Sequence, residues 1–291
     1  MRQAGVQSFG RLGMMSAHPE KKALDDQRSE VEEGRRFRFG ANWARFLELL
    51  DDGRIRMAED SLVGKLGVRD LAGKSFVDVG SGSGLFSLAA RRLGARVHSF
   101  DYDPLSVGCT AELRRRYFPE DRGWKVEEGS VLDRSYISRL GNFDVVYSWG
   151  VLHHTGRLWT ALENAAALVA PGGMLFVAIY NDQGPVSKYW KAVKHIYNRN
   201  WLGRLVMMAM HLPYVYVLRA LVRRLSTKGS PDRGMDLWRD ALDWLGGLPF
   251  EVAKPEEVFD FLRDRGFLLL RLRTCAGRLG CNEFVFLRPK K

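Results

Sequence analysis

The stretch Phe76-Val77-Asp78-Val79-Gly80-Ser81-Gly82-Ser83-Gly84 decides the fold, because it joins a short apolar strand to a glycine-rich turn. Residues 85–92 continue it as the start of a helix. A strand, a tight turn and a helix in this order open a βαβ unit, which provides a crevice for a nucleotide-type cofactor. Glycine has no Cβ, so such a turn bends sharply and lets a ligand approach the backbone.

The spacing of the turn favours S-adenosylmethionine over a dinucleotide. Gly80, Gly82 and Gly84 follow the pattern G-x-G-x-G, and the sixth position from Gly80 is Leu85. The dinucleotide fingerprint requires a small residue there, for close packing of the helix. Asp78 stands at the end of the strand, where a carboxylate repels a pyrophosphate and attracts an amino group or a sulfonium. The sequence therefore predicts S-adenosylmethionine as the cofactor.

Further strands follow at the intervals of an alternating sheet. Residues 95–101 form a second predicted strand that ends in Asp101. This acid comes about 20 residues after the first glycine, where a carboxylate accepts hydrogen bonds from ribose hydroxyls. Residues 128–133 place Asp133 at the expected adenine edge, and residues 142–149 and 174–180 are predicted as further buried strands.

This order of motifs resembles the class I S-adenosylmethionine-dependent methyltransferases, with the firmest match from Lys74 to Tyr180. The resemblance implies an α/β, Rossmann-like fold: a seven-stranded, mostly parallel sheet with a closing antiparallel hairpin and a helical insertion. It also implies a role for each cofactor residue. Asp78 and the turn hold the methionine part, Asp101 the ribose, and Ser148 lies beneath the transferred methyl group. The predicted cofactor site comprises Trp43, Asp78, Gly80, Ser81, Gly82, Gly84, Asp101, Tyr102, Val131, Leu132, Asp133 and Ser148.

Methyl transfer requires alignment of the acceptor and removal of its proton. Histidine titrates near neutral pH, so His153 and His154, just after the Ser148 strand, are the first candidates for the base. Shaping the pocket or capping the next helix is the alternative. Asp182, after the following strand, is the second candidate, with helix N-capping an equally good explanation. Trp43 either covers the sulfonium with its aromatic face or anchors the packing.

We divide the chain into five parts. Residues 1–36 are a polar arm predicted to be disordered, and residues 37–73 are N-terminal helices at the cofactor mouth. Residues 74–180 are the cofactor-binding core, and residues 181–245 are a basic helical lid or insertion. Residues 246–291 supply a C-terminal helix and antiparallel strands that complete the core.

The net charge of +11 is concentrated in one segment. Residues 186–233 contain ten Lys and Arg residues against a single acid, Asp232. Such a patch suits an anionic substrate, a membrane surface or nucleic acid. Residues 205–218 have no Asp, Glu, Lys or Arg, yet they are too few to span a bilayer, which needs about 20 residues. The run is interpreted as a lid, a homodimer face or a helix lying on a membrane.

Other features limit the classes of function. Only three cysteines occur, without C-x-x-C spacing, so neither a disulfide framework nor a metal site is indicated. The N-terminus lacks the apolar core of a signal peptide. We therefore expect a cytoplasmic protein, with peripheral membrane contact through residues 186–233 as a further hypothesis.

The second half resembles the ubiquinone-biosynthesis O-methyltransferases, which also carry a basic helical insertion and an Asp-Trp-rich return, here residues 242–245. Those enzymes have a Glu-His pair, sometimes linked to a divalent metal, where this chain has His153-His154; we therefore predict no metal. The leading hypothesis is O-methylation of a small-molecule or lipid-linked acceptor. The alternatives are an RNA methyltransferase, disfavoured because no RNA-binding module or Asn-Pro-Pro-Tyr motif is present, and a non-catalytic cofactor-binding or membrane scaffold.

Overall fold

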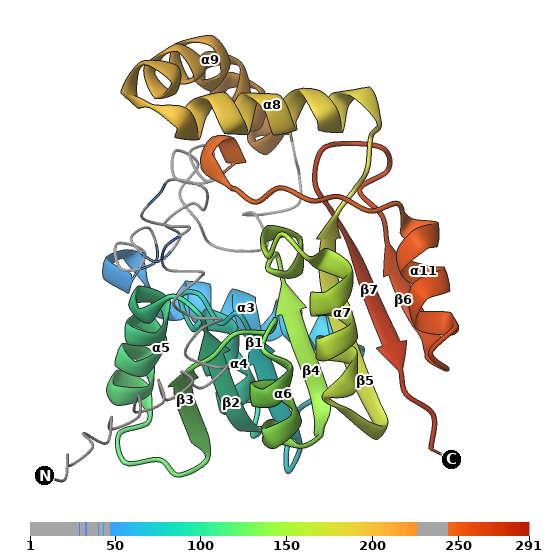
Figure 1. Ribbon diagram of the computed structural model, residues 1–291. Helices are drawn as coiled ribbons and strands as arrows, with labels where there is room; N and C mark the ends of the chain where they lie inside the picture. The colour runs from blue at the N-terminus through green and yellow to red at the C-terminus, as the bar shows by residue number, and fades with distance from the viewer. Residues whose placement is uncertain are drawn as a thin grey trace, which may run out of the picture.

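A seven-stranded sheet forms the centre of the computed structural model (Figure 1). The structure describes residues 47–225 and 244–290 together with Ser29, Glu33, Gly40 and Trp43; for 214–216 and 218–225 it describes the backbone alone. The predicted disordered arm, residues 1–36, therefore lies almost entirely outside the described residues.

The strand order is β3-β2-β1-β4-β5-β7-β6. The first five strands pair in parallel, whereas β7 runs antiparallel to both β5 and β6. This arrangement confirms the predicted mostly parallel sheet with its closing hairpin. The strand bounds are β1 Ser75–Val79, β2 Arg96–Asp101, β3 Trp124–Glu128, β4 Phe143–Trp149, β5 Val169–Tyr180, β6 Leu268–Arg273 and β7 Cys281–Leu287.

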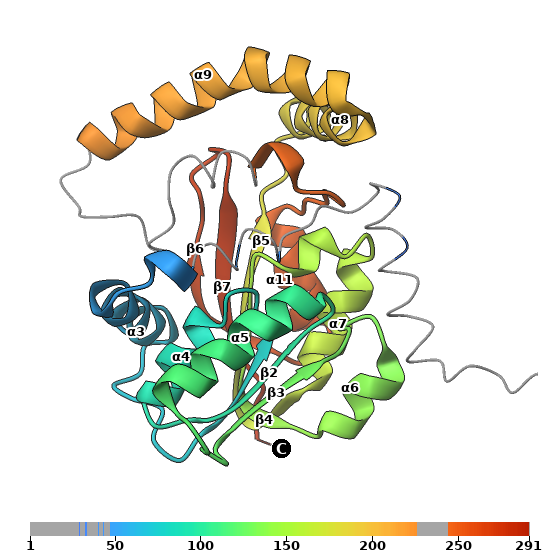
Figure 2. The ribbon, with the colours of Figure 1, turned by 90° about the vertical axis from the view of Figure 1, so that its left-hand side faces the viewer.

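Helices cover both faces of the sheet, because neighbouring residues of a strand point to opposite sides. Phe76 belongs to the core shared with α3, α4 and α5, whereas Val77 belongs to the core shared with α6, α7 and α11. Figure 2 shows α3 and α4 on one side of the sheet and α6 and α7 on the other. The bounds are η1 Leu47–Leu49, α3 Asp52–Leu66, α4 Leu85–Arg92, α5 Pro104–Tyr117, α6 Arg134–Leu140, η2 Leu152–His154, α7 Leu158–Ala167 and α11 Pro255–Arg263.

The predicted helical insertion follows β5 as α8 (Pro185–Arg199) and α9 (Trp201–Leu225). Both helices lie above the carboxyl ends of the strands (Figure 1). They pack on residues 244–250 through a third apolar core, which includes Trp190, Met207 and Trp244. Among the described residues, no helix has the length and apolar character needed to cross a membrane. The boundaries of the five predicted parts remain a prediction.

The order in which strands are added to the sheet reverses at β1: β2 and β3 lie to one side of β1, and β4 and β5 lie to the other. In open parallel sheets the crevice at such a switch point, outside the carboxyl ends of the strands, is where ligands bind. The ends of β1, β2, β4 and β5 are therefore where the predicted site residues must meet.

Candidate functional site

The glycine turn after β1 adopts a backbone that favours glycine at three positions. Gly80, Gly82 and Gly84 have φ values of 77°, 55° and 78°. A Cβ on Gly80 would lie 2.4 Å from Val151 Cγ1, and one on Gly84 would lie 2.8 Å from Thr110 Cα. Close packing of the turn against neighbouring elements thus excludes larger residues at these two positions.

Two buried carboxylates stand beside this turn. Asp78 and Asp101 are 4% and 7% exposed, and they lie near the carboxyl ends of adjacent strands. The Oδ2 atom of Asp101 accepts a hydrogen bond from the Gly82 amide at 3.0 Å, and Oδ1 accepts one from the Asp103 amide at 3.0 Å. Asp101 therefore also braces the turn that it flanks.

Burial makes both acids poor at ionising on their own. It raises the pKa of Asp78 to about 7, although the Ser87 hydroxyl, 2.5 Å from Asp78 Oδ2, opposes the shift by stabilising the charged form. Burial likewise raises the pKa of Asp101 to about 6. A cation beside Asp78 and hydroxyl donors beside Asp101 would offset this cost. An ammonium group and a ribose meet both needs, so these residues fit S-adenosylmethionine.

Trp43 lies against the glycine turn. A Cβ on Gly82 would come within 3.1 Å of the Trp43 indole nitrogen. The Gly40 amide donates to Asp103 Oδ2 at 2.9 Å, which ties the segment before Trp43 to the end of β2. Trp43 also packs against the α3–α5 core, so its position agrees with both roles weighed for it, cofactor cover and packing anchor.

The predicted adenine residues lie beyond β3, around the start of α6. Asp133 Oδ1 accepts hydrogen bonds from the amides of Ser135 and Tyr136, at 2.9 and 3.1 Å, so Asp133 is the N-cap of α6. Val131 is buried and Leu132 is half-buried. The amide of Gly129 donates to the Asp101 carbonyl at 2.9 Å, which joins this loop to the end of β2. Contact of these three residues with adenine stays a prediction.

The end of β4 brings the histidine pair to the same edge of the sheet. Ser148, predicted to lie beneath the methyl group, is fully buried, and its hydroxyl donates to the Val79 carbonyl at 3.1 Å. The His153 ring, also fully buried, packs against Tyr180 of β5 in a tilted arrangement, with 3.9 Å between ring centroids. The Tyr180 amide donates to His153 Nδ1 at 3.3 Å, which leaves the proton of a neutral His153 on Nε2.

His154 has the opposite tautomer. Its Nδ1 lies 2.7 Å from the Pro249 carbonyl oxygen. A carbonyl only accepts, so Nδ1 carries the proton and Nε2 of the neutral ring presents its lone pair. The ring lies 5.4 Å from that of Tyr180 and is only half-buried. His154 therefore has the protonation pattern and the access that a general base requires.

Asp182 serves the turn into α8. Its Oδ1 accepts a hydrogen bond from the Gly184 amide at 2.8 Å, and its own amide donates to the Ala253 carbonyl at 3.2 Å. Among the described residues, no three His, Cys, Asp or Glu side chains gather as metal ligands. None of the three cysteines, all in the described part, forms a disulfide.

Three contacts of the site have no signal in the sequence. Ser87, Thr110 and Val151 close around Asp78, Gly84 and Gly80 from α4, α5 and the loop after β4. Each is an ordinary residue for its element. Only the sheet order and the helix packing bring them to the turn.

A sheet of this order, with a glycine turn at its switch point and a buried acid on each of the first two strands, defines the class I S-adenosylmethionine-dependent methyltransferase fold. The family described as "Methyltransferase domain" matches residues 44–229, and this chain belongs to it. The predicted fold, enzyme class and cofactor are thereby confirmed.

Curated relatives match about two fifths of the chain. The ubiquinone biosynthesis O-methyltransferase of Methylobacterium sp. (strain 4-46) is 32% identical over 116 residues, which is 40% of this chain and 45% of that protein. The protein of the same name from Xanthomonas oryzae pv. oryzae (strain PXO99A) is 35% identical over 112 residues, 38% of this chain and 45% of that protein. The chain thus spans less than half the length of these relatives.

Solved structures share the fold at low sequence identity. An O-methyltransferase family protein from Burkholderia thailandensis has a TM-score of 0.53 and 15% identity, covering 93% of this chain and 70% of its own. The magnesium protoporphyrin IX methyltransferase from Synechocystis PCC 6803, with bound S-adenosylhomocysteine, has a TM-score of 0.51 and 16% identity, covering 85% of this chain and 94% of its own.

Proposed function

We propose that the protein transfers the methyl group of S-adenosylmethionine to a hydroxyl oxygen of a small-molecule acceptor. One observation carries the proposal: the glycine turn with its two buried acids and the His153-His154 pair lie at the same carboxyl edge, on either side of the switch point. The names of the two relatives described above, both ubiquinone biosynthesis O-methyltransferases, support oxygen as the accepting atom.

The cofactor residues divide by chemistry. Asp78 would face the amino group and Asp101 the ribose hydroxyls, with Trp43 against the glycine turn and Val131, Leu132 and Asp133 towards the adenine. Bound S-adenosylmethionine supplies an electrophilic methyl group on a sulfonium. The chain's own task is to align the acceptor oxygen with that carbon and to remove the acceptor's proton.

His154 is the proposed general base. With Nδ1–H held by the Pro249 carbonyl, Nε2 takes the hydroxyl proton as the oxygen–methyl bond forms and the carbon–sulfur bond breaks. The resulting imidazolium keeps its hydrogen bond to Pro249, which orients the ring throughout the step. His153 is suited to a supporting role, because its buried ring is packed against Tyr180.

Replacing His154 by alanine is expected to lower kcat about 100-fold or more, since general-base catalysis contributes about 10²–10⁴-fold. The affinity for S-adenosylmethionine should stay within about twofold, because His154 follows β4 whereas the cofactor acids lie on β1 and β2. Steady-state turnover of a hydroxyl acceptor and calorimetry measure the two effects. The matched variant Asp182→Asn keeps a side-chain oxygen for Gly184 and should retain turnover. Wild-type kcat in His154→Ala, or its loss in Asp182→Asn, would move the base role to Asp182.

We further infer that the acceptor is lipid-linked and that α8 and α9 meet it at an anionic membrane surface. These helices contain no Asp or Glu. Large apolar side chains are exposed along them, Trp201 to 77%. Interspersed exposed cations suit anionic headgroups, and the apolar side chains suit the acyl boundary. The exposed apolar residues include Tyr189, Ile196, Trp201, Leu202, Leu205 and Met210, and the exposed cations Lys188, Lys191, Arg199 and Arg204.

The protein is expected to sediment with vesicles that contain phosphatidylglycerol and to bind pure phosphatidylcholine vesicles weakly. Replacing Leu202 and Leu205 together by serine should weaken vesicle binding at least about tenfold, because each leucine loses its apolar burial. Leu105→Ser, at a leucine 55% exposed on α5, is the matched control and should bind like the wild type. A homodimer in light scattering that the double variant separates, without vesicle binding by the wild type, would instead make this face a dimer interface.

A further inference from the structure

Asp78 lies at one end of a chain of hydrogen bonds that the cofactor site itself does not require. The Ser87 hydroxyl donates to Asp78 Oδ2 at 2.5 Å, and the Ser99 hydroxyl donates to Ser87 Oγ at 2.7 Å. The Trp124 indole N–H donates to Ser99 Oγ at 2.9 Å. Ser87 and Ser99 are fully buried and Trp124 is 1% exposed, so water cannot replace these partners.

The sheet register places these groups together. Asp78 of β1 pairs directly with Ser99 of β2, and one strand further Trp124 of β3 pairs with Val97. Phe76, Val97 and Trp124 all belong to the core on the α4 side. Since side chains alternate along a strand, Asp78 and Ser99 face the same side and meet Ser87 in the first turn of α4.

The chemistry of the donors and acceptors fixes the direction of this series of hydrogen bonds. An indole N–H donates and cannot accept, and a serine hydroxyl has a single proton. With Trp124 donating to Ser99 and the ionised Asp78 only accepting, the Ser99 proton goes to Ser87 and the Ser87 proton goes to Asp78. Every donor therefore points toward Oδ2 of Asp78, and successive hydrogen bonds of one direction reinforce each other.

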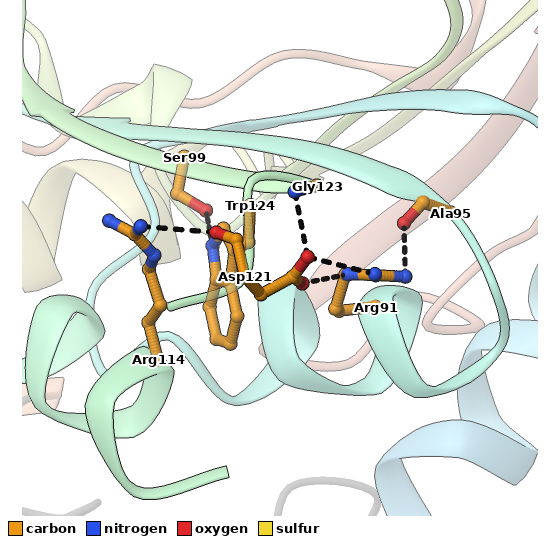
Figure 3. Close-up of polar contacts among 7 residues, drawn as sticks. All are labelled: Arg91, Ala95, Ser99, Arg114, Asp121, Gly123 and Trp124. Carbon is orange, nitrogen blue, oxygen red and sulfur yellow. Dashed lines mark hydrogen bonds and ion pairs between the residues drawn. The ribbon is translucent and has the colours of Figure 1, made fainter. Parts of the chain in front are cut away.

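Trp124, at the outer end of this series of hydrogen bonds, follows a segment that is held by several polar contacts. Figure 3 shows Arg91 of α4 beside Asp121. Arg91 Nε donates to Asp121 Oδ2 at 2.5 Å and Nη2 donates to Oδ1 at 3.2 Å. Asp121 Oδ1 accepts the Gly123 amide at 2.8 Å, and the Asp121 carbonyl accepts Arg114 Nη2 at 3.1 Å. These contacts hold the residue before Trp124 against α4 and α5. The same helix, α4, thus carries both the anchor Arg91 and the inner donor Ser87.

We propose that Ser87, Ser99 and Trp124 are positioning residues that hold Asp78 as an oriented, ionised acceptor for the amino group of S-adenosylmethionine. The proposal rests on the proposed function, in which Asp78 contacts that amino group. None of the three residues needs to touch the cofactor; they act through the carboxylate.

The pKa of Asp78 reports on the hydrogen bond from Ser87, because the groups around the carboxylate shift that pKa in opposite directions. Burial raises the pKa of Asp78 to about 7, the negative charge of Asp101 raises it as well, and the Ser87 hydrogen bond lowers it. From α5, Cys109 feels the charges of Asp103 and Asp101, and Tyr147 of β4 pairs with Asp78. The α4 cations Arg91 and Arg92 are already paired, with Asp121 and Glu59.

The affinity for S-adenosylmethionine is expected to depend on pH through Asp78. Below its pKa Asp78 is neutral and attracts an ammonium group poorly, so cofactor affinity rises as pH rises through about 7. Removing the Ser87 hydroxyl removes a donor to the charged form, which raises the pKa of Asp78 further. The rise in affinity then moves to higher pH.

The test compares Ser87→Ala and Ser99→Ala with Ser61→Ala, which removes a buried hydroxyl that has no assigned partner among the described residues. Carboxyl ¹³C NMR follows the Asp78 titration in the protein without cofactor, with Asp78→Asn assigning the signal; calorimetry gives cofactor affinity against pH. Ser87→Ala should shift the titration upward by about one unit, with roughly tenfold weaker binding near pH 7 and recovery at high pH. Ser99→Ala should shift it less in the same direction, and Ser61→Ala not at all.

An unshifted Asp78 titration in Ser87→Ala overturns the positioning role, and so does a loss of affinity that is equal at every pH. The Asp78 titration is measured without cofactor, so it tests the series of hydrogen bonds independently of cofactor binding. Failure of the wild type to bind S-adenosylmethionine contradicts the proposed function instead.

Discussion

Replacing Asp101 by alanine is expected to weaken S-adenosylmethionine binding about 100-fold. The carboxylate is buried at the end of β2, where it is proposed to accept the ribose hydroxyls, and hydrogen bonds to a charged group contribute about 1.5–3 kcal/mol each. The substitution also removes the acceptor for the Gly82 amide, so the glycine turn loses its brace. Isothermal titration calorimetry measures the affinity directly.

Asp144→Ala is the matched control for losing a structural carboxylate. Asp144 lies at the opposite end of β4, where its Oδ2 accepts the amide and the hydroxyl of Ser75, both at 2.8 Å. This variant should lose stability but keep wild-type affinity for the cofactor. If Asp101→Ala binds as tightly as the wild type, Asp101 is not the ribose anchor.

Replacing Gly84 by alanine is expected to cost about 2–5 kcal/mol of unfolding free energy and to abolish measurable cofactor binding. At φ 78° a Cβ adds about 1–2 kcal/mol of strain. The same atom would lie 2.8 Å from Thr110 Cα, a backbone atom of α5 that cannot rotate away, which adds about 1–3 kcal/mol of overpacking. Urea denaturation measures the stability.

The variant Gly73→Ala separates the cost of backbone strain from the cost of steric overlap. Gly73 has a similar φ of 71°, but a Cβ there meets no described atom within 4 Å. This variant should lose only the roughly 1–2 kcal/mol of strain and should bind the cofactor normally. Equal losses at the two glycines would show that close packing of the turn contributes nothing.

The placement of the glycine turn beside Asp78 and Asp101 was predictable because its signals are local. A strand, three spaced glycines and an acid at the end of the next strand lie within 26 residues, from Phe76 to Asp101. Strand propensity and glycine turns act over the same short range. The structure pairs β1 and β2 in parallel and sets Asp78 opposite Ser99.

The rest depends on tertiary packing. Ser87 and Thr110 reach the site only because α4 and α5 lie on the same face of the sheet. His154 was a candidate from the sequence, but its tautomer depends on Pro249, which is 95 residues away. The sequence allowed three interpretations of the apolar run at residues 205–218. It does not show which of these side chains pack on residues 244–250, since the third apolar core forms only in the folded protein.

Asp133 illustrates how one local pattern supports two roles. The same residue that the motif order assigned to the adenine edge also precedes a helix, and aspartate is a favoured N-cap. The structure gives it the cap hydrogen bonds to Ser135 and Tyr136. A side chain can cap a helix and line a ligand site at once, so only cofactor contact decides its second role.

Calorimetric titration of the wild-type protein with S-adenosylmethionine and, separately, with NAD tests the assignment of the glycine turn most directly. Saturable binding of S-adenosylmethionine without binding of NAD is the expected result, because the buried carboxylate of Asp78 suits a cation and repels a pyrophosphate. Binding of NAD alone, or of neither ligand, would contradict the assignment of this site to S-adenosylmethionine.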